Sequence, residues 1–196
     1  MPDVLTLSKY TGLLATALLS ANLLLGMFIA TRYKQTKWWH RMPLFLKKTG
    51  LFRIHNLTAY VGLLLALLHP FLLLFESGHR YQWLTLIFPI DAPAQPWINA
   101  LGSAALLLLV AVVITSVKTV RRQFAFRTWK AIHLAAYGAA VLFLIHGLLI
   151  NTQLKETTVD LFDAERMVSL GCFAGLMVAA FLRLRYWFKR KKLSKR

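Results

Sequence analysis

Five uninterrupted apolar segments leave this chain few folds other than a bundle of membrane-spanning helices. About 20 residues, rising 1.5 Å each, cross a hydrocarbon core of roughly 30 Å. The runs are solidly apolar rather than alternating, which excludes a transmembrane β-barrel. The sequence, 58% hydrophobic, therefore predicts an all-α integral membrane protein. The predicted spans cover approximately residues 10–31, 54–75, 97–117, 131–151 and 166–184.

The basic residues predict how these spans are oriented. The net charge of +17 would indicate nucleic-acid binding in a soluble chain, but Lys and Arg here cluster between spans. Residues 32–53 hold seven, residues 118–130 hold five, and the segment from Arg183 holds eight. The positive-inside rule then places the amino terminus outside and the carboxyl terminus in the cytoplasm. The basic tail from about residue 185 is expected to bind anionic membrane lipid, and no nucleic-acid partner is expected.

The sequence has no motif for a covalently attached haem and none for a bound nucleotide. Cys172 is the single cysteine and lies in the fifth span, so a disulfide framework and a CxxCH haem attachment are excluded. No GxGxxG motif occurs, and flavin or nicotinamide is expected only through a separate partner. Residues 1–196 are predicted to form a single domain in which no internal repeat is evident.

Four of the six histidines lie in two spans that run from the cytoplasm to the exterior. His55 and His69 are 14 residues apart in the second span, and His133 and His146 are 13 apart in the fourth. Each span thus has one histidine near each face, at levels about 20 Å apart. Fourteen residues return to within roughly 40° of the same helix face, whereas thirteen fall about 140° away. The fourth span is therefore expected to tilt, bulge or unwind.

Histidines at matched depths favour two stacked haems. A pair of neutral imidazoles binds b-type haem iron without a covalent bond, and a polar side chain buried in a membrane needs a partner. We therefore predict two non-covalent b-type haems between the second and fourth spans, with His55, His69, His133 and His146 as iron ligands. The alternative is a non-haem transporter whose histidines carry protons or divalent metal. Such a route needs further polar residues between the two histidine levels, and these are few: Asn56, Thr58, Tyr60 and Tyr137.

The stretches "FRIHNLTAYVGLLLALLHP" and "FRTWKAIHLAAYGAAVLFLIHG" resemble the ferric reductase-like transmembrane domain, which ferric reductases and NADPH oxidases share. The likeness covers about residues 10–185. In that family, paired histidines on two helices ligate two b-type haems, so the resemblance implies His55 with His133 on the inner haem and His69 with His146 on the outer haem. Full-length relatives usually have six spans followed by flavin and nicotinamide domains, whereas this sequence shows five spans and a basic tail.

The resemblance implies a component of an oxidoreductase. We expect transmembrane electron transfer from a cytoplasmic donor, a flavoprotein reductase or quinol, to an exterior ferric chelate, oxygen or exported redox protein. In size the chain is similar to the haem-binding membrane subunits of methionine sulfoxide reductases. It could likewise relay electrons to a periplasmic reductase without substrate chemistry of its own. The expected location is a cell membrane, as a multi-pass protein of the bacterial inner membrane.

Three further features carry expectations about the region around the histidines. Pro70 removes a helical donor directly after His69 and predicts a kink there. Tyr60 and Tyr137 are candidates to lie beside the haems. The apolar, aromatic segment 80–97 is expected to lie along the outer membrane interface, either covering the outer haem or anchoring the chain through its tryptophans.

Overall fold

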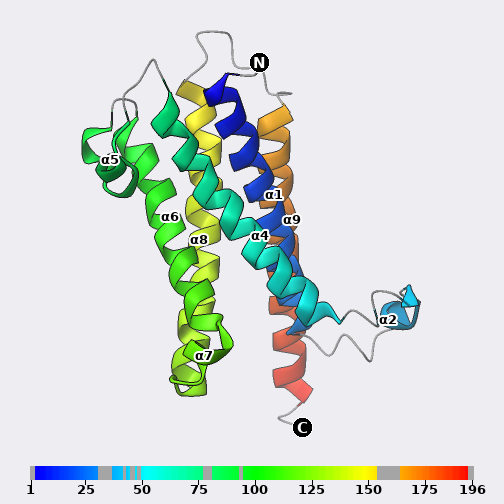
Figure 1. The fold of residues 1–196 in the computed structure, drawn as a ribbon. Coiled ribbons are helices and arrows are strands. Elements are labelled where there is room, and N and C mark those ends of the chain that lie inside the picture. The colour runs from blue at the N-terminus through cyan, green and yellow to red at the C-terminus, as the bar shows by residue number, and fades with distance from the viewer. Residues whose placement is uncertain are drawn as a thin grey trace.

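Five long helices dominate the computed structural model, shown in Figure 1. They are α1 (Val4–Ile29), α4 (Leu51–Leu72), α6 (Pro96–Ser116), α8 (Phe126–Gln153) and α9 (Ala164–Leu193). The shorter elements are α2 (Lys37–Arg41), η2 (Leu73–Phe75), α5 (Trp83–Ile87), η3 (Pro89–Asp91) and α7 (Lys118–Arg121). The structure describes residues 3–30, 37–41, 43–44, 47, 50–76, 81–92, 95–153 and 164–193, among which no strand occurs.

Each long helix includes a segment that is long and apolar enough to cross a membrane. These segments run over Val4–Ile29, Leu51–Phe75, Pro96–Ser116, Phe126–Ile150 and Arg166–Arg185. The five predicted spans are therefore confirmed, and the chain is a multi-pass membrane protein. Many large apolar side chains on these helices are exposed, as a lipid solvent allows.

The long helices are arranged as two antiparallel pairs and a fifth helix (Figure 1). We call the end at which α1 begins the upper end, and the opposite end the lower end. α1 descends and packs along the ascending α4, while α6 descends and packs along the ascending α8. α9 lies against α1 and α8. The two pairs thus repeat one arrangement, although the sequence shows no evident repeat.

Small residues let the pairs approach one another. Ala15, Ala105, Ala139 and Ala140 are among the most buried apolar side chains of the described chain. Helix interfaces in membranes use such residues because lipid offers no hydrophobic driving force and close packing must supply the attraction. The buried core is therefore thin, and polar side chains contribute much of what joins α1 to α4.

The expected disturbance near Pro70 is a change of helix type. α4 continues through Pro70 to Leu72 and then becomes the 3₁₀ helix η2. The N–H of Leu73 bonds to the Pro70 carbonyl, as a 3₁₀ turn requires. The carbonyl of His69, one turn before the helix ends, instead accepts a hydrogen bond from a hydroxyl on α1.

Candidate functional site

The structure brings the four histidines together in two pairs, one toward each end of the bundle. His69 and His146 form the upper pair, with ring centroids 6.5 Å apart and planes inclined at 68°. His55 and His133 form the lower pair, with centroids 6.3 Å apart and planes inclined at 71°. Both pairs join α4 to α8, as the sequence predicts. α8 is a continuous helix, so neither pair depends on an interruption of it.

Main-chain carbonyls fix both imidazoles of the upper pair. The Nδ1–H of His69 donates to the Ser8 carbonyl of α1 at 2.7 Å. The Nδ1–H of His146 donates to the Ile98 carbonyl of α6 at 2.8 Å. A carbonyl can only accept, so Nδ1 carries the proton and the neutral ring keeps its lone pair on Nε2. Each ring is therefore held in the tautomer that a metal ligand needs.

The lower pair is held at the same ring atom but over longer distances. The Nδ1–H of His55 donates to the Asn22 carbonyl of α1 at 3.3 Å. His133 instead has the Ser116 hydroxyl of α6 at 3.2 Å from its Nδ1. The hydroxyl proton of Ser116 is directed to the Val112 carbonyl at 2.7 Å, which leaves its oxygen to accept from His133. The Nε2 lone pair again stays available at both rings.

Two polar side chains of α1 also bond to the backbone of the histidines on α4. Ser8 Oγ donates to the His69 carbonyl at 2.8 Å. Asn22 Nδ2 donates to the His55 carbonyl at 2.6 Å and to Thr58 Oγ1 at 2.7 Å. Each residue thus gives a bond to a histidine's main chain and receives one from its ring. These reciprocal bonds set both the axial and rotational position of α4 on α1.

Glycines allow three of the imidazoles to lie directly against a neighbouring helix. Each glycine follows, by four residues, the residue whose carbonyl accepts the imidazole proton. A Cβ atom there would lie closer to the ring than nine in ten native Cβ contacts do. The nearest ring atom would be 2.9 Å away at Gly12 (from His69), 3.1 Å at Gly26 (from His55) and 3.0 Å at Gly102 (from His146).

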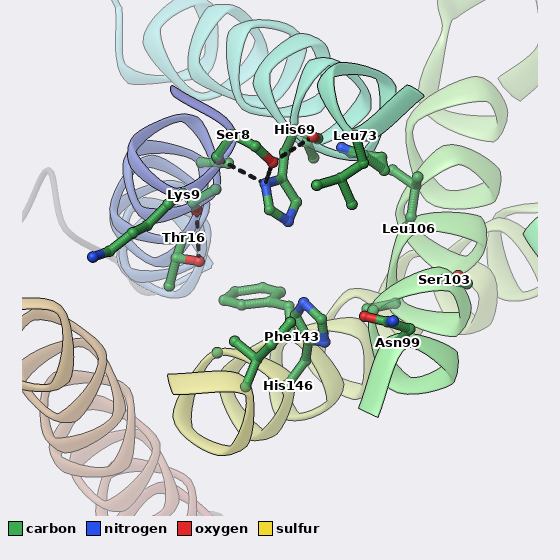
Figure 2. A pocket seen from close by; sticks show the side chains of 18 of the residues that line it. Ser8, Lys9, Thr16, His69, Leu73, Asn99, Ser103, Leu106, Phe143 and His146 are labelled. Atoms are coloured by element: carbon green, nitrogen blue, oxygen red, sulfur yellow. Dashed lines mark hydrogen bonds between the residues drawn. The ribbon is translucent and has the colours of Figure 1, made fainter. Parts of the chain in front are cut away.

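The upper pair faces a cavity of about 360 Å³. Figure 2 shows the imidazoles of His69 and His146 pointing into it from opposite walls, with Phe143 beside His146. Its volume lies in the range of small-molecule and cofactor sites, about 300–1,000 Å³. Asn99 and Tyr81 add polar groups to its lining. Burial, with a smaller contribution from Glu76, raises the pKa of Tyr81, so its phenol remains neutral.

An aromatic ring and a cation flank the lower pair. Trp129 stacks on His133, with ring centroids 5.1 Å apart and an interplanar angle of 23°. The guanidinium of Arg121 lies 4.4 Å from the Trp129 ring centroid on α8. Among the described residues, Trp129 Nε1 is buried without a hydrogen-bond partner. No role was predicted for Trp129 from the sequence, where it stands four residues before His133.

The structure also describes several other residues that the sequence singled out. Tyr60 is 49% exposed on the surface of α4. The Tyr137 hydroxyl accepts a bond from Arg183 at 2.9 Å and joins α8 to α9. His40 is exposed on α2, and His79 lies outside the described residues. Trp83 is 64% exposed, as an interfacial anchor would be.

The donor set fits an iron porphyrin better than a bare metal ion. Among the described residues, no group of three or more His, Cys, Asp or Glu side chains converges. Two imidazoles leave a metal short of ligands unless a macrocycle supplies the others. With a metal–nitrogen bond of about 2.0–2.1 Å and a centroid about 1.1 Å beyond the nitrogen, two opposed imidazoles have centroids roughly 6–6.5 Å apart. Both observed separations agree.

Comparison with known proteins then identifies the family. The chain matches the family described as ferric reductase like transmembrane component over residues 11–144, more than half of its length. The match includes most of α1 and all of α4 and α6, and it ends two residues before His146. Searches of curated proteins and of solved structures find no match. With paired histidines on two of its five membrane helices, the chain belongs to the ferric reductase-like transmembrane component family.

Proposed function

We propose that the chain conducts single electrons across a cell membrane through two non-covalently bound b-type haems. One observation carries this proposal. In each of two histidine pairs, 14 residues apart along α4, the two imidazoles have the separation expected for two ligands of one iron. Domains of this family generally bind haem. The number and type of haem are our inference from the two pairs.

The four histidines have the leading roles in this proposal. His69 and His146 would hold the upper haem, and His55 with His133 the lower one. Bound haem supplies one-electron exchange at its iron. The protein contributes ring orientation, a fixed tautomer and a raised ligand basicity, each of which follows from the bond at Nδ1. The apolar outer faces of the helices keep the path within the bilayer.

Electrons would enter at the lower end, which we assign to the cytoplasm. Lys118, Arg121, Arg122, Arg127 and Lys130 are exposed there, around α7 and the start of α8. Such basic residues stay on the cytoplasmic side of membranes. They also complement an acidic partner, and this favours a soluble flavoprotein as the donor, with quinol as the other candidate. Arg53 on α4 and Arg185 on α9, both exposed, extend the same charge.

The decisive experiment is an absorption spectrum of the full chain purified from haem-replete cells. We expect a Soret band, reduced α and β bands, and two haems per chain by pyridine haemochrome. H69L and H146L should each retain about one haem, the lower one. The matched control H40L, at an exposed histidine, should retain two. A chain without a Soret band contradicts the proposal, and so does equal loss of both haems in every single variant.

A second measurement tests the acceptor. The chemically reduced chain is mixed with a ferric chelate or with oxygen, and reoxidation is followed in the α band. Rapid reoxidation that is slowed in H69L supports direct reduction of a small acceptor at the upper end. A reduced spectrum that persists with both acceptors contradicts direct reduction and indicates a relay subunit that needs an exported protein partner.

A further inference from the structure

Ser116 stands where the other three histidine contacts have a glycine, and this makes the two iron sites unlike. We propose that Ser116 is a positioning residue, which separates His133 from a helix carbonyl and thereby gives the lower haem a higher midpoint potential than all-carbonyl ligation would give it. This inference rests on the haem ligation proposed above. It concerns how one ligand is held, rather than which residues are ligands.

The contacts follow a common register on α1 and α6. In each, a residue with an acceptor carbonyl is followed four positions later by a small residue, and the pattern recurs after 14 residues on the same helix. Fourteen residues also separate His55 from His69. The four acceptor and small-residue pairs are Ser8 with Gly12, Asn22 with Gly26, Ile98 with Gly102, and Val112 with Ser116.

Helix geometry explains why the fourth position matters. The carbonyl of one residue points toward the N–H four residues later, so a ring that bonds to this carbonyl must lie across the later residue. Glycine leaves room for that approach at three contacts. At Ser116 the side chain fills the space and its hydroxyl takes over the contact, donating to Val112 and accepting from His133.

At His133 the relay replaces a carbonyl acceptor by a hydroxyl oxygen, and the bonds at Nδ1 are longer in the lower pair than in the upper pair. The direct bonds of the upper pair, at His69 and His146, are 2.7 and 2.8 Å long, whereas the relayed bond at His133 is 3.2 Å. A shorter bond from Nδ1–H to a carbonyl gives the imidazole more anionic character, favours ferric iron and lowers the midpoint potential. His55 bonds directly to the Asn22 carbonyl at 3.3 Å, so the length of its bond is independent of the relay at Ser116.

The test is a reciprocal exchange in the full chain, read by redox titration. In S116G, His133 can approach the Val112 carbonyl directly. The midpoint potential of the lower haem, the more positive of the two, should therefore become more negative, while that of the upper haem stays unchanged. In G102S, the added side chain displaces His146 from the Ile98 carbonyl, so the midpoint potential of the upper haem should become more positive. S116T keeps a hydroxyl and should keep the native potentials.

A matched control removes a neighbouring hydroxyl. Thr115 bonds to Ala111 and, at 3.2 Å, to the same Val112 carbonyl. T115A should leave both midpoints unchanged. If S116G loses the lower haem, His133 has not taken up the Val112 carbonyl, and the potential shift inferred for Ser116 is wrong. If S116G keeps two haems and both native midpoints, the inference is wrong although the haem proposal stands. A native chain without haem would overturn the haem proposal itself.

Discussion

At the residue scale, the histidines could be found from the sequence, but the residues that hold them could not. Paired spacing on two co-directional spans marked all four imidazoles. Ser8, Gly12, Asn22 and Gly26 escaped notice because small and polar residues in membrane helices usually serve packing alone. One signal was available: Gly12 and Gly26 have the same 14-residue spacing as the histidines that they face.

Gly12 offers a direct test of close packing against an imidazole. In G12A, the new Cβ would lie 2.9 Å from His69 Nδ1, and neither helix can yield without losing the bonds of Ser8. We expect loss of most of the upper haem and retention of the lower, measured by haem content per chain. The control G138A adds a methyl group where nothing lies within 4 Å and should keep both haems. Full haem occupancy in G12A would mean that close packing of Gly12 against His69 is not needed to hold the upper haem.

Asn22 tests the bonds that join α1 to α4. In N22A, the His55 carbonyl and Thr58 hydroxyl lose donors at 2.6 and 2.7 Å. Hydrogen bonds between membrane helices contribute about 0.6 kcal/mol on average and up to about 1.7, so we expect a loss of roughly 1–2 kcal/mol in unfolding free energy. Denaturation in mixed detergent measures it. T11A, which removes a bond within α1 alone, serves as the control, and an equal loss in both variants would contradict the assignment.

At the element scale, helix starts were harder to predict than helix presence. The first span was expected to begin near residue 10, but α1 begins at Val4. Ser8 and Thr11 interrupt the apolar pattern there, yet both are buried and bonded, Ser8 to His69 and Thr11 to the Leu7 carbonyl. The polar groups that obscure the helix in the sequence are therefore the ones that build the site.

The 13-residue spacing on α8 shows a second limit. An ideal helix turns His133 and His146 about 140° apart, so a bulge or unwinding was one expectation. Because α8 is continuous from Phe126 to Gln153, we attribute the approach of both rings toward α4 to the inclination of the helices. Figure 1 shows α4 running obliquely across the bundle. Crossing geometry of this kind cannot be obtained from the period of one segment.

The short helix α5 carries an apolar surface that a membrane interface would cover. Leu84 is 70% exposed and Ile90, in the following η3, is 82% exposed. The Ser103 hydroxyl donates to the Leu86 carbonyl at 2.7 Å and holds α5 on α6. An environment-sensitive fluorophore on L84C, in a C172S background, should show blue-shifted emission in liposomes. A probe on R122C provides the polar reference, and equal emission from both would place α5 in water.

At the scale of the whole molecule, the number of spans and the family were predictable, whereas the packing of the spans was not. Hydropathy and length specify five helices, and the family match covers residues 11–144. Which helices touch depends on bonds between residues far apart in sequence, such as Asn22 with His55. The resulting pairs, α1 with α4 and α6 with α8, each present one histidine toward each end.

The orientation of the molecule decides the direction in which electrons would move. If the lower end is cytoplasmic, an inside-negative potential favours outward movement by about 2.3 kcal/mol per electron for every 100 mV. With C172S as background, a membrane-impermeant maleimide should label D91C, at an exposed polar position, in intact cells but label R122C only after the membrane is permeabilised. The background alone should stay unlabelled throughout. Labelling of R122C in intact cells, with D91C protected, would reverse the assigned direction, and the same potential would then oppose electron delivery to the upper end.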